Sequence, residues 1–337
     1  SDVAVQERIA SWMRTAIGVI ESSHIRVMRV ADNMRNVAVT EGDKVEAHLK
    51  FGWEIDAYPV NEIAESVAVV SDADTNALVE EYYSKYDILL EGRDPEEFKK
   101  HVAVQAKIEL GFERFLEEKN YHAIVTHFGD LGALQQLPGL AIQRLMEKGY
   151  GFGGEGDWKT AAMVRLMKIM TQGVKNAKGT SFMEDYTYHL VEGNQLSLGA
   201  HMLEVCPSMA DPEGKIKIET HHLGIGMNEK DPARLVFKNR IGDAIVVSLI
   251  DMGGRLRLIV QDIVCVKPIM PMPNLPVARV MWRAMPDLTT GVECWITAGG
   301  AHHTVLSYDV TAEQMKDWAK MMDIEYVHIT KDTTVEG

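Results

Sequence analysis

The chain has no long hydrophobic run and little cysteine. Its most apolar stretch, Ala244 to Ile250, leads directly into Asp251, and a membrane-spanning helix needs about 20 consecutive apolar residues. The three cysteines, Cys206, Cys265 and Cys294, lie far apart and form no C-x-x-C motif. This pattern excludes a disulfide framework and a thiolate zinc site, and it is typical of a reducing compartment.

Positive charge is also scarce. The 35 lysine and arginine residues face 49 acidic residues, which leaves a net charge of −14. Because an acidic surface repels phosphate backbones, we expect no nucleic-acid partner. The first residues, Ser1-Asp2-Val3, lack a methionine and lack the basic and apolar segments of a signal peptide. We therefore expect a cytoplasmic protein without a membrane partner, or a piece of a longer chain.

What is present is the composition of an ordinary globular protein. The 337 residues are 46% hydrophobic and 25% charged, which predicts two domains or one large one. Up to about residue 178, segments with helical periodicity alternate with short apolar strands, a pattern that favours an α/β domain with a parallel sheet. The first helix is indicated by a stripe of apolar residues at helical spacing: Val5, Ile9, Trp12, Met13, Ala16, Ile17 and Ile20. Further helices are predicted at 96–118, 134–148 and 158–170, and strands at 25–30, 53–60 and 121–126.

After residue 178 the pattern becomes β. Short strands separated by Gly, Pro and Asp predict a barrel or a sandwich. We expect strands at 215–220, 234–238, 244–251, 256–266 and 292–297, then a helix at 312–322 and a last strand at 326–330. The fold class is therefore α/β, with a central parallel-sheet domain followed by a mostly β, barrel-like C-terminal domain.

A glycine-rich segment, Gly151-Phe152-Gly153-Gly154-Glu155-Gly156, matches the pattern G-x-G-x-x-G. A dinucleotide site needs a strand directly before this pattern, and here a helix is predicted there, so we reject a nicotinamide site. The glycines still predict a tight turn into the helix near Trp158, which places Glu155 beside a helix N-terminus. A carboxylate is favourable at that position, and an ordinary helix-start acid is the simpler interpretation.

Glu184 is the second unusual acid. If 180–188 is a strand, Glu184 shares one face with three aromatic residues, and a carboxylate in that setting is costly unless it is paired or bound to a cation. An exposed edge strand is an equally good interpretation. His201 lies in the apolar segment 201–206, where a hydrogen-bonded core histidine is more usual than a ligand.

Two adjacent histidines, His302 and His303, follow the strand predicted at 292–297. Neighbouring residues of an extended chain point to opposite sides, so only one of the two is expected to face a given site. Two glutamates and two histidines in partly apolar settings suit a divalent metal with open coordination positions. Such mixed ligands favour Mn²⁺, Co²⁺ or Mg²⁺ over a closed structural zinc site.

Taken together, several strings resemble signatures of the L-arabinose isomerase family, and the resemblance covers essentially the whole chain. The strings are Asp32 to Arg35, Leu137 to Leu140, Gly151 to Ala162, Gly179 to Tyr188, His201 to Pro207 and Ala298 to Thr304. The resemblance implies a Mn²⁺ held by Glu155, Glu184, His201 and His303, with Glu155 and Glu184 as the acid–base pair. It further implies that Met34 and Phe128 line a sugar pocket.

The same resemblance implies a fucose-isomerase-like central domain and a metal-dependent conversion of L-arabinose to L-ribulose, or D-galactose to D-tagatose, through a cis-enediol. It divides the chain into a residual helix of a missing N-terminal domain (1–25), a central domain (26–177) and a C-terminal domain (178–337). It also implies a homo-oligomer in which a neighbouring subunit's first domain covers the sugar site. Two alternatives stay open: an isomerase of another aldose such as L-fucose, and a non-catalytic metal- or sugar-binding fragment.

Overall fold

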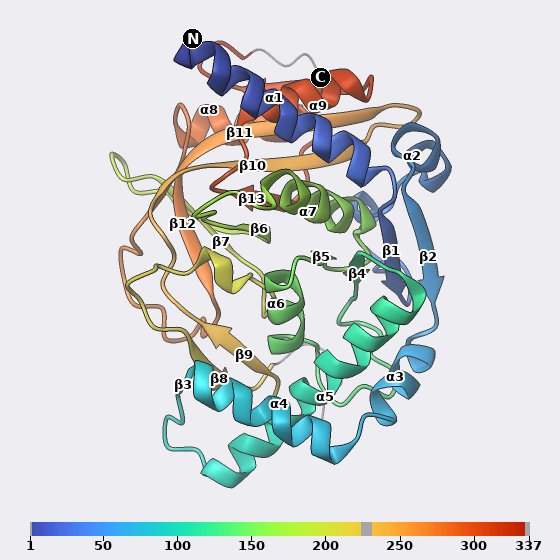
Figure 1. The fold of residues 1–337 in the computed structure, drawn as a ribbon. Helices are drawn as coiled ribbons and strands as arrows, with labels where there is room; N and C mark the ends of the chain where they lie inside the picture. Colours follow the sequence, from blue (N-terminus) through green and yellow to red (C-terminus); the bar gives the residue numbers. More distant parts are fainter. Residues whose placement is uncertain (1, 224–230, 334–337) are drawn as a thin grey trace.

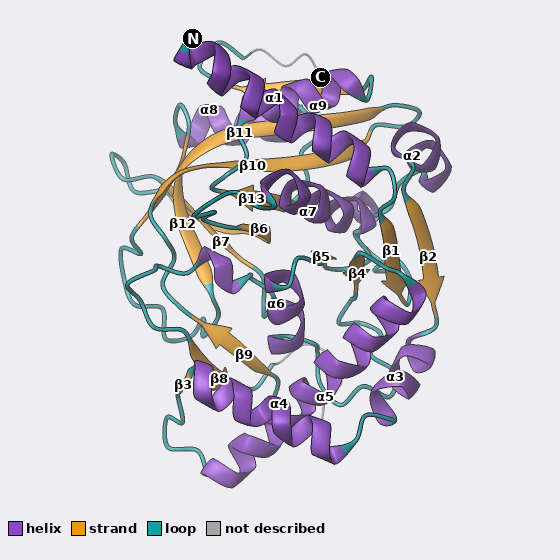
Figure 2. Ribbon diagram, viewed as in Figure 1, coloured by secondary structure: helices purple, strands orange, loops and turns teal. Residues whose placement is uncertain are grey.

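The structure is a computed structural model that describes residues 2–223 and 231–333. Its strands form three sheets, which Figure 1 shows with the helices around them. In Figure 2 several helices fill the lower part of the view, and the longest strands lie in the upper part with further helices above them. No helix within the described residues is long and apolar enough to cross a membrane.

The first sheet is parallel, as the sequence predicts, and it has the strand order β2-β1-β4-β5. Its central strands are buried because helices cover them. The strands are β1 (Arg26–Val30), β2 (Glu54–Tyr58), β4 (Ala123–Val125) and β5 (Gly151–Gly153). The helices of this half are α2 (Lys44–Phe51), α3 (Val60–Ala68), α4 (Asp72–Lys85), α5 (Pro95–Lys119), α6 (Leu140–Glu147) and α7 (Trp158–Thr171).

The second sheet closes into a barrel. Six antiparallel strands follow the order β10-β13-β6-β7-β12-β11, and β11 pairs back with β10. A closed barrel leaves no free edge among these six strands, which removes a site of unwanted pairing. The strands are β6 (Thr180–His189), β7 (Leu196–Ala200), β10 (Gly242–Asp251), β11 (Leu256–Val266), β12 (Arg279–Ala284) and β13 (His303–Ser307), and β14 (Glu325–Ile329) adds in parallel to β11.

The third sheet joins the two halves of the sequence. The short strand β3 (Asp87–Ile88) pairs in parallel with β8 (Lys217–Thr220), which pairs with β9 (Ala233–Val236). The main hydrophobic core also continues from one half into the other, because Phe152, Phe182 and Trp318 belong to the same buried cluster. The two halves therefore share a hydrophobic core and one small sheet. The division into two domains near residue 178 stays a prediction.

Two predicted elements differ from the structure. Residues 292–297 lie in helix α8 (Leu288–Thr297) rather than in a strand, because Asp287 caps the helix by accepting hydrogen bonds from the amide and hydroxyl of Thr290. Helix α6 begins at Leu140 instead of residue 134. The segment Pro138-Gly139 precedes it, and proline disfavours helical backbone in the residue before it.

The predicted first helix is confirmed as α1 (Val3–Ser22), which lies beside α9 (Ala312–Met321) at the top of Figure 1. Its inner face is made of small or polar residues: Thr15, Gly18 and Ser22 are buried, and Thr15 donates a hydrogen bond to the Gln314 carbonyl. The apolar stripe points outward, with the large side chains Val5, Ile9, Trp12, Met13, Ile17 and Ile20 all exposed.

Candidate active site

The four predicted ligand residues lie in one region of the fold, where the parallel sheet meets the barrel, and of the four Glu155 and His303 belong to a group whose ligand atoms all lie within 4.8 Å of one another. Glu155 follows the end of β5, and His201 follows the end of β7. Glu184 on β6 lies opposite His303 on β13 and opposite Ala200 on β7 in the register of the barrel. Strand pairing therefore places a carboxylate between two histidines that are more than a hundred residues apart in the sequence.

The glycines around Glu155 allow this close packing. Glu155 itself has a φ of +56°, in the left-handed region that residues other than glycine rarely adopt. A Cβ at Gly154 would lie 2.9 Å from Nε2 of His201, and one at Gly156 would lie 2.7 Å from Cα of Asn33. The absence of a side chain at Gly154 therefore allows the segment that carries Glu155 to pack closely against His201. Backbone strain of this kind is concentrated at functional sites.

Each predicted ligand histidine is oriented by a carboxylate. Nδ1 of His303 lies 3.1 Å from Oδ2 of Asp157, and Nδ1 of His201 lies 2.6 Å from Oε2 of Glu204. Nε2 of His303 is fully buried, has no hydrogen-bond partner among the described residues, and lies 3.7 Å from Oε2 of Glu155. Proteins orient metal-ligating imidazoles in this way, with one ring nitrogen held by an acid and the other left for the metal. The donor set therefore fits a divalent cation.

His302 departs from the prediction that the two adjacent histidines face opposite sides. Its Nε2 lies 3.2 Å from Oε2 of Glu155, and its ring centroid is 4.1 Å from that of His303. The alternation rule does not apply because β13 begins only at His303. Glu155, His302 and His303 form the one triad, within the described parts of the chain, whose ligand atoms all lie within 4.8 Å of one another.

The two glutamates have different electrostatic surroundings. Burial raises the pKa of Glu184, the nearby charge of Glu155 adds to this rise, and His201 and His302 oppose it. Burial acts in the same direction on Glu155, but the hydrogen bond from His302 and the charges of the surrounding histidines outweigh it and lower the pKa. Two acids with different proton affinities in one site are a common arrangement for acid–base chemistry.

A cavity of about 190 Å³ opens beside these residues. Phe128, Glu155, Glu184 and His201 all line this cavity. Met34 does not, but its backbone amide donates a hydrogen bond to the carbonyl of Glu155. The remaining lining residues are Thr126, His127, Leu137, Gly154, Tyr186, Met202 and Glu204.

Sequence reasoning did not assign roles to Asp157 or Glu204. A signal was present for each of them. Asp157 is the N-cap of α7, where it accepts hydrogen bonds from the amide and hydroxyl of Thr160, and Glu204 follows His201 by three residues. Neither signal predicts that the carboxylate reaches a histidine ring, because that contact depends on tertiary packing.

The fold and the site define a two-part α/β and barrel protein with a candidate divalent-metal centre between its parts. Family models match both parts: that of the L-arabinose isomerase central domain matches residues 26–173, and that of the L-arabinose isomerase C-terminal domain matches residues 179–325. The chain therefore belongs to the L-arabinose isomerase family.

Individual relatives support this assignment. The chain is 53% identical over 331 residues to L-arabinose isomerase of Halalkalibacterium halodurans, covering 98% of the chain and 65% of that protein. It is 54% identical over 336 residues to the enzyme of Geobacillus thermodenitrificans, and 53% identical over 334 residues to that of Bacillus subtilis. These matches cover 100% and 99% of the chain and 66% of each relative. The chain thus spans slightly less than two thirds of the length of these curated relatives.

Proposed function

We propose that this chain carries the catalytic residues of an aldose–ketose isomerase that converts L-arabinose to L-ribulose, with D-galactose to D-tagatose as a side reaction. The observation that carries the proposal is the junction site. There, two glutamates and two carboxylate-oriented histidines lie together beside a small cavity. The names of the relatives supply the substrate class.

In this proposal Glu155, Glu184, His201 and His303 hold Mn²⁺, with Co²⁺ or Mg²⁺ as substitutes. The bound ion supplies Lewis-acid polarisation of the carbonyl of the open-chain sugar. Asp157 and Glu204 keep Nδ1 of His303 and His201 occupied, so that each ring presents Nε2 to the site. His302 beside Glu155 adds positive charge that favours the ionised carboxylate.

The isomerisation moves two protons. One glutamate carries the carbon-bound proton from C2 to C1 through a cis-enediol, and the other relays the hydroxyl proton from O2 to O1. Glu155 and Glu184 are the two acids on the wall of the cavity that also belong to the predicted ligand set. The apolar side chains Phe128, Leu137 and Met202 line the same cavity and would limit the access of water to the reacting carbon atoms.

We also propose a homo-oligomer in the cytoplasm as the working form. The exposed apolar stripe of α1 supports burial of this surface against another chain, because large apolar side chains seldom gather on a solvent-facing surface without a role. The three described cysteines are free and buried, which suits a reducing compartment.

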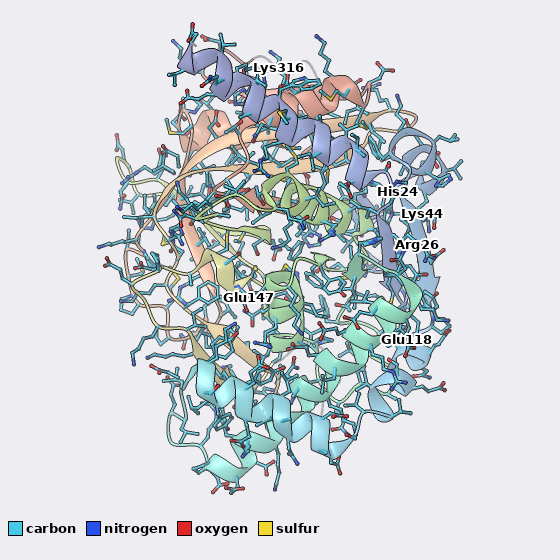
Figure 3. All side chains as sticks on the ribbon, viewed as in Figure 1. His24, Arg26, Lys44, Glu118, Glu147 and Lys316 are labelled. Carbon is cyan, nitrogen blue, oxygen red and sulfur yellow. The ribbon has the colours of Figure 1, made fainter. Side chains whose placement is uncertain are left out.

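The test strips the protein with a chelator, restores Mn²⁺ and measures ketose formation from a panel of aldoses that includes L-arabinose, D-galactose and L-fucose. Glu155→Gln and Glu184→Gln should each lower the rate by about 10²–10⁴-fold, the usual contribution of general acid–base catalysis. Glu118→Gln is the matched control, because Glu118 is exposed on α5, on the outer side of the molecule in Figure 3.

The outcomes separate the alternatives. Preference for L-fucose would identify an isomerase of another aldose. A rise in Tm on addition of Mn²⁺ without turnover of any sugar would identify a non-catalytic metal-binding fragment. Ketose formation that survives in both glutamate variants would contradict the assigned acid–base pair.

A further inference from the structure

A second hollow, separate from the candidate active site, lies where the segment between β9 and β10 meets the segment that follows β11. It has a volume of about 820 Å³ and shares no lining residue with the site cavity. Three backbone segments form its wall: residues 211–213, 238–241 and 267–271. Arg279 also lines the hollow, and it lines a neighbouring hollow as well.

The wall of this hollow is basic although the chain is acidic. Lys238, Arg240, Lys267 and Arg279 line it, and within residues 2–223 and 231–333 none of these four forms an ion pair. Asp211 and Glu213 are the acids of the same wall, so the hollow carries a formal surplus of two positive charges in a chain whose net charge is −14. Carboxylate Oδ1 of Asp211 is already engaged by the amide of Glu213.

Two of the guanidinium groups have unused donors. Nε of Arg240 and Nε of Arg279 are buried without a hydrogen-bond partner in the described structure. Nη1 of Arg279 donates to the carbonyls of Leu275 and Val277, which fixes the position of its planar group. Burial lowers the pKa of Arg279, and no acid compensates this effect. A buried donor without a partner is costly, so such groups in a folded protein need an explanation.

Two of the three backbone segments of the wall, 211–213 and 238–241, are held in place without a ligand. The amide of Asp211 donates to the carbonyl of Lys238, and the amide of Arg240 donates to that of Met209. The hydroxyl of Tyr308 donates to the carbonyl of Arg240. Because these bonds tie both segments together, binding at this wall would require little ordering of the chain.

We infer that this hollow binds a small organic phosphate. A phosphate dianion matches the surplus of two positive charges, and guanidinium groups bind phosphate oxygens with paired N–H donors while lysines add charge. The hollow is larger than a phosphate ion, and Ile241, Ile269 and Met270 give it an apolar surface for the organic part of the ligand. This inference does not depend on the proposed isomerase activity.

The test uses the whole chain and phenyl phosphate as the probe in isothermal titration calorimetry. Inorganic phosphate and phenol serve as the separate halves of the probe. We expect saturable binding of phenyl phosphate, weaker binding of phosphate and no binding of phenol. Lys267→Gln and Arg240→Gln should each weaken binding by about tenfold or more, the loss of one charge-assisted contact.

Lys316→Gln is the matched control. Lys316 is exposed on α9 at the top of Figure 3, whereas β9, which leads to Lys238, lies in the lower half of Figure 1. Lys267 is exposed, so its replacement should fold normally even if Arg240→Gln does not. Equal binding by Lys267→Gln and the control, or no saturable binding of phenyl phosphate, would overturn the inference. Dissociation of an oligomer by Lys267→Gln without phosphate binding would also overturn it, and would identify an interface between copies.

Discussion

The junction site and the outer face of α1 invert the usual distribution of side chains in opposite ways. At the junction, charged and polar groups are buried, and the predicted ligand histidines each have a carboxylate partner. On α1, large apolar groups are exposed, while Thr15, Gly18 and Ser22 face the protein. Burial of charge is tolerated where partners and a ligand compensate for it, whereas a gathered apolar surface is a feature of interaction sites.

The largest effect in this comparison should come from Asp157. Asp157→Asn keeps a cap for α7 but removes the charge that holds Nδ1 of His303, so we expect Mn²⁺ affinity to fall by about 10–100-fold. Metal titration monitored by thermal shift measures this. Asp43→Asn is the matched control, because Asp43 also caps a helix, through the amides of Val45 and Glu46, but is exposed. Equal metal affinity in the two variants would show that Asp157 acts only as a cap.

The second-largest effect on metal affinity should come from Gly154→Ala. The new Cβ would lie 2.9 Å from Nε2 of His201, the atom that we assign to the metal. Displacement of this ring should weaken Mn²⁺ binding by about tenfold, within the range for a disturbed ligand geometry. Gly214→Ala, whose Cβ would come no closer than 3.2 Å to its neighbours, is the comparison variant. Unchanged metal affinity in Gly154→Ala would remove His201 from the ligand set.

On α1, replacing the buried Gly18 should lower the stability of the chain more than replacing any exposed apolar residue. Gly18→Leu would place its Cβ 2.6 Å from Cγ of Met170 on α7, and we expect the free energy of unfolding to fall by about 1–3 kcal/mol because of overpacking. Denaturant unfolding measures this change. A variant as stable as the parent would mean that α1 does not pack on α7 through this face.

The smallest effect should come from the apolar stripe itself. Ile9→Gln and Ile17→Gln should change the free energy of unfolding by less than about 0.5 kcal/mol, since both side chains are exposed. Sedimentation velocity should nevertheless detect weaker self-association than in the parent chain. If both variants lose several kcal/mol instead, the stripe stabilises the single chain. An unchanged sedimentation profile would leave the oligomer without support from α1.

Much of the fold follows from local pattern. The strands β10 and β11 occupy almost the predicted residues, because branched apolar runs flank a Gly-Gly turn. Helix α5 follows from its apolar spacing and from the Asp94-Pro95 start. The error at α8 has the same origin, since the short run 292–297, which is apolar or β-branched apart from Glu293, supports either a helix or a strand until its cap is known.

The motif strings predict the residues of the candidate site but not their geometry. Glu155, Glu184, His201 and His303 were identified through motif strings, and their proximity depends on the register of β6 with β13 and β7. The structure also places His302 beside Glu155, which an alternation rule for extended chain does not predict. Loop geometry before β13 decides this position.

The sequence by itself determined which side chains are present and where most helices and strands form, because these depend largely on neighbours along the chain. The tertiary structure alone decided which six strands close the barrel, which glycines stand against distant residues, that acids hold Nδ1 of two histidines, and that the stripe of α1 faces outward. The physical reason is that periodicity reports which residues share a face of an element. What that face meets depends on packing between segments that are distant in the sequence.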